Sequence, residues 1–334
     1  MQGKKEIIAK ALHYTGAGRL LRAARTWSGV LVLNYHRIGD PHGCLFDRGV
    51  WSASAEGFDR QVGMLKRQFD VISPADLDRA LLDRRGQYVM LTFEDGYLDN
   101  YELAFPVLKA HRVPATFFLT SGFLDRGTVA WWDDIAWMVR SSVRSRLQST
   151  RWTNRVIEFD EPIREQAIYT LLSIYKQLPH EETDCFLDEI ARLTGSDRCP
   201  KALDEPVWMS WEMVREMRRA GMAIGGHTVT HPILSRLPEA RQRWEVAECK
   251  RRIEAELGEP IDAFSYPVGS LDSFDEATRR ALDAAGYRWS FSFFGGFTRG
   301  APQDPLTIPR MAVDHALTSE RFTALLTWPQ LFAG

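Results

Sequence analysis

Residues 88–97 read YVMLTFEDGY. The first six residues are uncharged, and two carboxylates, a glycine and a tyrosine follow them. An unbroken apolar run of this length is typical of a strand buried on both faces of a parallel sheet. Similar runs occur in VLVLNY (residues 30–35) and ATFFLT (residues 115–120), and each is followed by a helical pattern. The repetition predicts an α/β fold with parallel strands, closed or nearly closed into a barrel.

The alternation of strands and helices extends over most of the chain. Further strands are expected at residues 222–225, 263–266, 288–293 and 306–310. Helices are expected around residues 58–65, 74–82, 98–110, 211–220, 239–257 and 274–285. Residues 131–203 differ, because their pattern is helical and polar with no convincing strand. We interpret them as a helical insertion on the active-site face of the barrel.

Length and composition favour one soluble domain. A chain of 334 residues with 45% hydrophobic and 26% charged residues suits a single α/β barrel. We therefore divide it into an N-terminal segment, residues 1–29, and one barrel domain, residues 30–334. The net charge of −2 offers no basic field for nucleic acid. Four scattered cysteines and the lack of a recognisable secretion signal predict a cytoplasmic protein.

The N-terminal segment departs from the overall charge balance. Residues 1–37 contain seven Lys or Arg and one Glu, and apolar residues are interleaved with these charges. The simpler interpretation is a solvated helix that packs on the barrel. The alternative is a basic amphipathic stretch that contacts an anionic membrane surface, at the inner face of the membrane for a cytoplasmic protein.

Candidate reactive residues follow the predicted strands directly. They are His36, the pair Glu94–Asp95, His227, and the pair Tyr266–Pro267. The carboxyl ends of parallel strands converge on one face of a barrel, where active sites are built. We therefore expect these side chains to share a pocket.

Two histidines in HTVTH, residues 227–231, are candidate metal ligands. A spacing of i, i+4 puts both imidazoles on one side of a helical turn, although two surface or capping histidines would look the same. With Asp95 they would form an open site of two His and one Asp. The neighbouring Glu94 could then accept a proton; the alternative is an acidic pair at a helix N-terminus.

The motifs TFEDGY, HTVTH and SYPVG, in this order, resemble those of the polysaccharide deacetylase family (carbohydrate esterase family 4, the NodB homology domain). The likeness extends over roughly residues 30–125 and 205–315. It implies a distorted (β/α) barrel of about seven strands and a divalent metal, expected to be zinc. By position, the resemblance assigns Asp95, His227 and His231 as metal ligands, Glu94 as general base, the backbone N–H of Tyr97 as oxyanion donor, and Tyr266 and Pro267 as substrate-binding residues.

The chain departs from the family pattern at three places. Glu94 stands where the family has Asp, and the extra methylene moves the carboxylate by about 1.5 Å, a displacement large enough to affect the rate. Ser265 stands where the third motif usually has the Arg that pairs with the base. Arg310, in IPRMAVD, is a candidate to supply that charge; a surface arginine is the alternative.

The third departure concerns the general acid. The family's L-x-H motif has no clean copy here, and His315 in VDHAL is a loose candidate. Asn34-Tyr35-His36-Arg37 resembles the Y-H sequence that supplies the acid in members acting on bacterial exopolysaccharides. His36 is therefore favoured over His315, and a core imidazole bonded to backbone is the alternative.

The function expected from these features is metal-dependent removal of N-acetyl groups from a saccharide, which could be an exopolysaccharide or a lipid-linked or nucleotide-linked sugar. Hydrolysis of another C–N bond or of an O-acetyl ester is the first alternative. A non-catalytic sugar-binding relic of the same fold is the second. No organic cofactor is expected, because no glycine-rich phosphate loop occurs.

Overall fold

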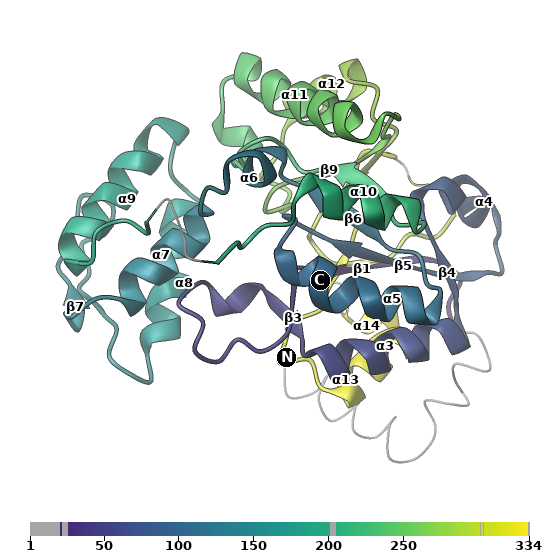
Figure 1. Cartoon of the computed structure of the whole chain (residues 1–334), viewed down its shortest axis with the longest axis horizontal. Coiled ribbons are helices and arrows are strands. Elements are labelled where there is room, and N and C mark those ends of the chain that lie inside the picture. The colour runs from purple at the N-terminus through teal and green to yellow at the C-terminus, as the bar shows by residue number, and fades with distance from the viewer. Residues whose placement is uncertain (1–20, 22–25, 201–204, 301, 303, 333–334) are drawn as a thin grey trace.

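The computed structural model describes residue 21 and residues 26–200, 205–300, 302 and 304–332. Among these residues, eight strands form one sheet in which every pairing is parallel. They are β1 (Gly29–Tyr35), β4 (Asp70–Ile72), β5 (Gln87–Phe93), β6 (Thr116–Leu119), β9 (Ala223–Gly226), β10 (Ala263–Ser265), β11 (Trp289–Phe291) and β12 (Met311–Ala312). Seven follow the order β11-β10-β9-β6-β5-β1-β12, and β4 pairs with β5 beside them. Figure 1 labels β9, β6, β1, β5 and β4 of this sheet.

The sheet curls until its two edges are joined by one segment of chain. Ile308 forms a parallel bridge to Phe291 of the edge strand β11. Three residues later, Met311 pairs with Leu33 of β1. The predicted distorted (β/α) barrel is therefore confirmed. The strand predicted at 306–310 is wrong in extent, because Pro309 has no N–H for a ladder and continuous pairing begins only at Met311.

The central strands β1 and β5 alternate between two buried faces. They pair in register over seven residues, and Asn34 stands beside Thr92. Leu33 belongs to the large core under the surrounding helices, whereas Val30 and Val32 belong to a second core with residues of β5, β6, β10 and β11. Because side chains alternate along a strand, Asn34 and Thr92 share the inward face with Val30 and Val32. The inside of the barrel is thus apolar at one end and polar at its carboxyl end.

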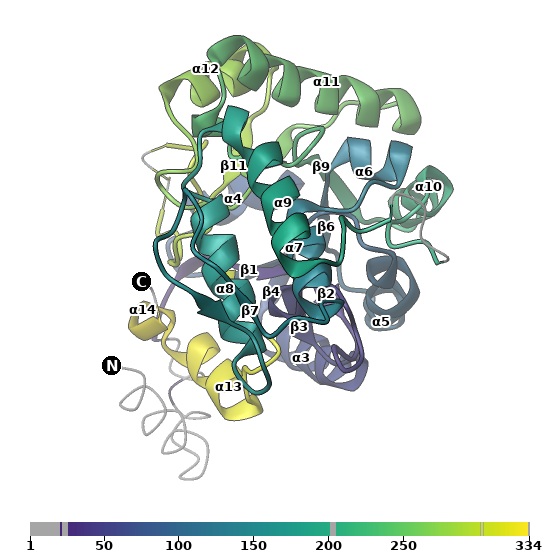
Figure 2. The same ribbon diagram turned by 90° about the vertical axis from the view of Figure 1, so that its left-hand side faces the viewer.

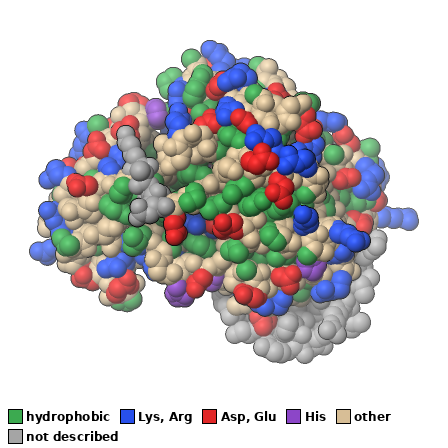
Figure 3. Space-filling model, viewed as in Figure 1, with side chains coloured by type: hydrophobic (Ala, Val, Ile, Leu, Met, Phe, Trp, Pro, Cys, Tyr) green, Lys and Arg blue, Asp and Glu red, His purple; other side chains and the backbone are tan. Residues whose placement is uncertain are grey.

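Helices surround the sheet (Figure 1). They are α3 (Ala55–Gln68), α4 (Leu77–Leu82), α5 (Phe105–His111), α6 (Ser121–Arg126), α10 (Trp211–Arg219), α11 (Glu239–Leu257), α12 (Glu276–Ala284), α13 (Ser319–Thr327) and α14 (Pro329–Phe332). The shorter elements are β2 (Arg37–Ile38), β3 (Trp51–Ala53), the 3-10 helices Arg48–Val50, Pro74–Asp76 and Leu234–Arg236, and a π-helix, Asn100–Ala104. On the described part of the face in Figure 3, basic and acidic side chains are interspersed.

The helix predicted at 98–110 is not one regular α-helix. Residues Asn100–Ala104 form a π-turn, in which Phe105 N–H donates to the carbonyl of Asn100, and α5 follows. Pro106 is the second residue of α5 and has no N–H to donate to the preceding turn. Residues 98–111 are nonetheless helical throughout, so the predicted helix is present, with a π-turn directly before Pro106.

Residues 131–200 form a unit beside the carboxyl ends of the strands, seen at the left of Figure 1 and facing the viewer in Figure 2. Its elements are α7 (Trp131–Arg140), β7 (Arg146–Leu147), β8 (Ile157–Glu158), α8 (Arg164–Tyr175) and α9 (His180–Thr194). The prediction of no strand here is wrong, because β7 and β8 pair antiparallel. A hairpin of two residues per strand is too short to give a period-2 pattern.

Most of the predicted N-terminal segment, residues 1–29, lies outside the described residues, and so do residues 201–203 at the end of the predicted insertion 131–203. The amphipathic character of residues 1–29 and their contact with a membrane therefore stay predictions. No helix in the described parts of the chain combines the length and apolarity needed to cross a membrane.

Candidate metal centre and catalytic site

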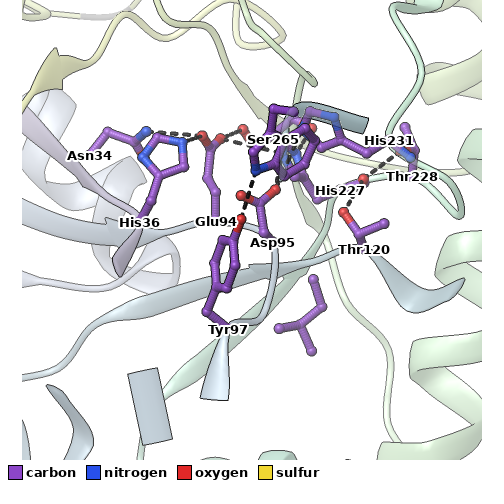
Figure 4. A network of polar contacts seen from close by, with 12 residues as sticks. Asn34, His36, Glu94, Asp95, Tyr97, Thr120, His227, Thr228, His231 and Ser265 are labelled. Atoms are coloured by element: carbon purple, nitrogen blue, oxygen red, sulfur yellow. Dashed lines mark hydrogen bonds and ion pairs between the residues drawn. The ribbon is translucent and has the colours of Figure 1, made fainter. Parts of the chain in front are cut away.

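Asp95, His227 and His231 meet at the carboxyl end of the barrel, as expected from their positions after β5 and β9. One ligand atom from each residue lies within 4.8 Å of the others. The Asp95 Oδ1 atom is 3.5 Å from Nε2 of His227 and 3.4 Å from Nε2 of His231 (Figure 4). All three side chains are buried. The structure therefore brings the three predicted ligands into one cluster.

A tight turn aims Asp95 into this cluster. Asp95 has a φ of 71° and Gly96 a φ of 94°. Aspartate tolerates the left-handed region better than most residues, and glycine adopts it without a steric penalty. A Cβ on Gly96 would also lie 2.9 Å from a methyl group of Leu124. The sequence Glu-Asp-Gly therefore gives two adjacent carboxylates different directions.

The HTVTH segment is not a helical turn, which corrects the expectation drawn from its spacing. It is an irregular loop after β9, with φ values of 67° at Thr228 and 55° at His231. The Thr228 hydroxyl accepts a hydrogen bond from the His231 N–H and donates one to the carbonyl of His227. This local bonding, and not an α-helical ladder, brings the two imidazoles to a ring separation of 4.7 Å.

Glu245 of α11 holds the same loop, and the sequence reasoning missed it. Its carboxylate is fully buried and accepts hydrogen bonds from the N–H groups of Val229 and Thr230, at 2.8 and 2.9 Å. Arg241 pairs with its other oxygen. A usable signal was present, because Glu245 falls on the buried stripe of α11 beside Val246.

The donor set fits a divalent cation. Two buried atoms, Asp95 Oδ1 and His227 Nε2, have no hydrogen-bond partner among the described residues. His227 Nδ1 donates to the carbonyl of Ser265 at 2.7 Å, which leaves its Nε2 as a free electron-pair donor. Burial raises the pKa of Asp95 to about 8 and lowers that of His227 to about 4. The bare cluster thus disfavours charge, and a cation would stabilise the carboxylate.

Glu94 points toward a second set of groups, on the other side of Asp95 from the histidine loop (Figure 4). Asn34 donates to its Oε2 at 3.0 Å, and Ser265 donates to its Oε1. His36 Nε2 lies 3.1 Å from the same Oε2 atom. The two residues predicted for proton transfer therefore contact each other directly.

Arg310 pairs with Glu94 from the end of the chain, and the surface-arginine alternative is wrong. Its guanidinium is fully buried, with Nη2 2.7 Å from Oε1 of Glu94. Nη1 donates to Asn34 Oδ1 at 2.7 Å, and Nε donates to the carbonyl of Ser292 at 2.9 Å. The Arg310 guanidinium, from beyond β11, thus supplies the positive charge beside Glu94 that Ser265 lacks.

These contacts set the protonation of the Glu94–His36 pair. Burial alone would raise the pKa of Glu94, but Arg310 and the two nearby histidines hold it well below its usual value. Burial lowers the pKa of His36, but the hydrogen bond and charge of Glu94 outweigh burial and raise it. At neutral pH Glu94 is therefore ionised and accepts hydrogen bonds on both oxygens.

A cavity of about 600 Å³ opens above this site. Its floor carries His36, Glu94, Asp95 and His231. One wall comes from residues 131–200 and presents Trp131 and Trp132 of α7 and Ile168, Tyr169 and Leu172 of α8. These helices therefore shape access to the site, as expected for an insertion on this face.

Tyr266 and Pro267, which were predicted to bind substrate, do not bring their side chains to the cavity. Tyr266 is fully buried, stacks on Phe274 at 3.9 Å and donates to the carbonyl of Leu306. Its side chain follows strand alternation into the core. The prediction that this side chain binds substrate is therefore wrong. Pro267 is also buried and absent from the lining, which includes Val268 instead.

The predictions for His315 and Tyr97 have different outcomes. His315 lies in a separate hollow beside α13, so it does not compete with His36 at this site. The Tyr97 side chain is buried and donates to Asp133 at 3.0 Å. Its backbone N–H directly follows the Asp95–Gly96 turn, and its role as an oxyanion donor stays a prediction.

The chain resembles known proteins in both sequence and fold. A family model described as polysaccharide deacetylase matches residues 82–290, which is more than half of the chain. A putative polysaccharide deacetylase, YxkH of Bacillus subtilis (strain 168), is 21% identical over 238 residues. That match covers 71% of this chain and 56% of the relative, so the chain spans little more than half of that protein.

Two solved structures resemble the whole barrel. The Streptococcus pyogenes deacetylase PplD in complex with acetate superposes with a TM-score of 0.58 and 18% identity, covering 87% of this chain and 95% of that one. IcaB from Ammonifex degensii gives a TM-score of 0.54 and 21% identity, covering 91% and 97%. At these identities the likeness demonstrates a shared fold.

Proposed function

The chain belongs to the polysaccharide deacetylase family of hydrolases, and on that premise we propose that it removes N-acetyl groups from an N-acetylated saccharide with the help of a divalent metal. One observation carries the proposal. Two members of the buried Asp-His-His cluster, Asp95 and His231, line one cavity together with His36 and the ion-paired Glu94.

Asp95, His227 and His231 would hold the metal, which we expect to be zinc because two imidazoles and one carboxylate suit that ion. When bound, the cation supplies Lewis acidity, which makes water more acidic and polarises an amide carbonyl. The orphaned Asp95 Oδ1 and His227 Nε2 atoms support this assignment.

Glu94 is the proposed general base. Its carboxylate is ionised, and contacts with Arg310, Ser265 and Asn34 fix its direction. It accepts a proton from the water that attacks the acetamide carbonyl. The backbone N–H of Tyr97 is the proposed donor to the oxyanion that forms at the carbonyl oxygen.

His36 is the proposed general acid. It lies 3.1 Å from Glu94 and lines the cavity, and its raised pKa favours the protonated form. It donates a proton to the amine nitrogen as the C–N bond breaks, and the products are acetate and an amino sugar. The pair then regains its starting state when the proton on Glu94 passes to His36, which has given its own proton to the amine.

The alternatives make different demands on the same site. Hydrolysis of an O-acetyl ester or of another amide needs the same metal and base, but less help from His36 for an ester, because an alkoxide leaves more easily than an amine anion. A non-catalytic relic has no need for a buried Glu94–Arg310 pair, since burying two charges is costly. Retention of that pair favours an enzyme.

The proposal names a class of substrate, the N-acetylated saccharides, and not one sugar. An exopolysaccharide, a lipid-linked sugar and a nucleotide-linked sugar all carry the N-acetyl group that the mechanism requires. A cytoplasmic location would favour the two activated sugars. We propose it together with a contact between residues 1–29 and the inner membrane face, which rests on the charge of that segment.

Acetate release tests the proposal. The protein loaded with Zn²⁺ is incubated with N-acetylated oligosaccharides, N-acetyl sugar nucleotides, O-acetyl sugars and cyclic amides. Release from an N-acetyl sugar that falls by at least 100-fold in Glu94→Gln supports it. Turnover confined to cyclic amides or esters would exclude the N-acetyl assignment, and no turnover on any substrate would favour the relic.

A further inference from the structure

The two candidate histidine ligands are held in different ways. A metal-binding histidine usually donates its second ring N–H to a carbonyl or carboxylate, which fixes the ring. His227 follows this rule through the carbonyl of Ser265. His231 does not, because its buried Nδ1 makes no hydrogen bond to another residue in the described parts of the chain. Some other interaction must therefore set the direction of the His231 ring.

Two aromatic side chains, Trp132 and Phe123, pack against the His231 ring. The Trp132 ring centre lies 4.5 Å from the imidazole centre, with the planes at 65°. Phe123 of α6 lies nearly parallel to the imidazole on a longer centre distance of 6.4 Å. The indole N–H of Trp131 donates to the backbone carbonyl of His231 at 3.3 Å. Both tryptophans come from α7, and α7 begins with them.

The Trp132 ring is itself fixed by a buried chain of hydrogen bonds. Its Nε1 donates to the hydroxyl of Tyr97 at 2.7 Å, and that hydroxyl donates to Asp133 at 3.0 Å. The other oxygen of Asp133 accepts the N–H of Asp47 at 3.0 Å. All these side chains are buried. Trp132 therefore has little freedom to turn away from His231.

We propose that Trp131 and Trp132, here called the indole clamp, are positioning residues that hold His231 in its metal-binding orientation. The clamp replaces the missing hydrogen bond at Nδ1 with ring packing and a backbone contact. Residues 131–200 then contribute to the metal centre itself and not only to the cavity wall. The inference rests on the metal site of the proposed function, but it does not depend on the identity of the saccharide.

Metal affinity tests the clamp without any substrate. The dissociation constant for Zn²⁺ is measured by competition with a chromogenic chelator on the folded full-length protein. Loss of a group that orients a ligand typically weakens metal binding by about 10–100-fold. We expect that range for Trp132→Ala. Trp132→Phe keeps an apolar ring beside His231 and should restore most of the affinity.

A matched control is available in the same unit. Trp152 is half-buried, packs on Phe186 at 5.2 Å and donates its indole N–H to Glu182 at 2.6 Å. It is thus a structural tryptophan of similar bonding that does not contact His231. Trp152→Ala should leave the Zn²⁺ dissociation constant unchanged. The visible spectrum of bound Co²⁺, which reports ligand geometry, should change in Trp132→Ala and not in Trp152→Ala.

The result that overturns the clamp is a folded Trp132→Ala variant whose Zn²⁺ affinity and Co²⁺ spectrum match those of the parent. If that variant does not fold, Trp131→Phe decides, because it removes the indole N–H to the His231 carbonyl and keeps an aromatic ring at this position. A several-fold loss of affinity supports the clamp, and unchanged affinity overturns it. Failure of acetate release with the expected Zn²⁺ effects would refute the proposed reaction alone, whereas a parent protein that binds no Zn²⁺ would refute the metal site itself.

Discussion

Glu94 has one more methylene than the aspartate of the family pattern, and its surroundings account for that length. Arg310 reaches the carboxylate from beyond β11, Asn34 reaches it from β1, and His36 reaches it from the position directly after β1. Ser265, on β10, offers only a short hydroxyl where the pattern has an arginine. The carboxylate is thus placed by partners at three strand ends. The longer side chain of glutamate lets it reach all of them.

We expect Glu94→Asp to lower kcat by about 100-fold, because withdrawing the carboxylate by about 1.5 Å separates it from Arg310 and His36. The Zn²⁺ dissociation constant should stay the same, since Asp95 is untouched. Glu102→Asp, a shortened exposed glutamate nearby in the chain, is the control. A rate equal to or above that of the parent would contradict the fit of Glu94 to its site.

Arg310 supplies the buried charge that Glu94 requires. Arg310→Met leaves that carboxylate buried without its cation, and breaking such a pair typically costs about 3–5 kcal/mol. Because the pKa of Glu94 is held below its usual value, this stability is present at neutral pH and is lost as pH falls through that lowered pKa. Urea unfolding at neutral and acidic pH measures both effects. A loss under about 1 kcal/mol at neutral pH would contradict the pairing.

His36 should set the alkaline limb of the pH–rate profile. A general acid must be protonated, so activity falls as pH rises through its pKa. Contact with Glu94 raises that pKa, and the limb should therefore lie above the ordinary value for histidine. The pH–rate profile of His36→Gln should lack this alkaline limb. A limb that persists unchanged in His36→Gln would assign the acid to another group.

At the scale of elements, the helix α11 contributes to the site from outside the barrel. Glu245 on its buried face binds two consecutive N–H groups of the loop between the histidine ligands. Hydrogen bonds to a charged group contribute about 1.5–3 kcal/mol each. A single side chain of α11 therefore couples helix packing to ligand geometry.

Glu245→Ala should lower the free energy of unfolding by about 3 kcal/mol and weaken Zn²⁺ binding by about 10-fold or more. Denaturant unfolding and chelator competition measure the two effects. Glu248→Ala is the matched control, because Glu248 is half-buried on the same helix, pairs with Arg251 and does not bond the histidine loop in the described residues. Equal Zn²⁺ affinity in a folded Glu245→Ala protein would show that the loop holds its shape without this carboxylate.

Long elements were predictable and short or irregular ones were not. The apolar runs of β1 and β5 exceed five residues, and α11 was predicted with its observed bounds. The HTVTH loop was misjudged because a spacing of i, i+4 does not distinguish a helical turn from a loop with left-handed residues at Thr228 and His231. Two-residue strands such as β7 leave no periodic pattern at all.

At the scale of the whole molecule, the site joins segments from both ends of the chain. Asn34 and Arg310 are hydrogen-bonded across 276 positions of sequence. Ligands at Asp95 and His227 come from separate strands of the same sheet. A cation bound there would cross-link elements that the unfolded chain holds far apart.

We therefore expect Zn²⁺ to stabilise the folded protein. A ligand at about 100 times its dissociation constant adds about 2.7 kcal/mol, which for a chain of this size raises Tm by about 5 °C. Thermal unfolding with and without Zn²⁺ measures the shift, and a chelator should reverse it. His227→Ala should show no Zn²⁺-dependent shift. An unchanged Tm in the parent protein at saturating Zn²⁺ would contradict a metal centre.

The sequence by itself determined the family, the barrel and the meeting of Glu94, Asp95 and His227 at one end of it. It could do so because parallel strands leave their carboxyl ends on one face, so a residue directly after a buried apolar run has a predictable place. The family predicted from three short motifs is confirmed by the match over residues 82–290.

Only the tertiary structure decided which distant groups complete the site. Arg310 pairs with Glu94, Tyr266 turns into the core, Glu245 holds the histidine loop and Trp132 packs on His231. Each of these facts depends on strand register and on packing between elements far apart in sequence. Local patterns fix where a strand or helix lies along the chain, but the partner of a side chain is fixed by the three-dimensional contacts that folding creates.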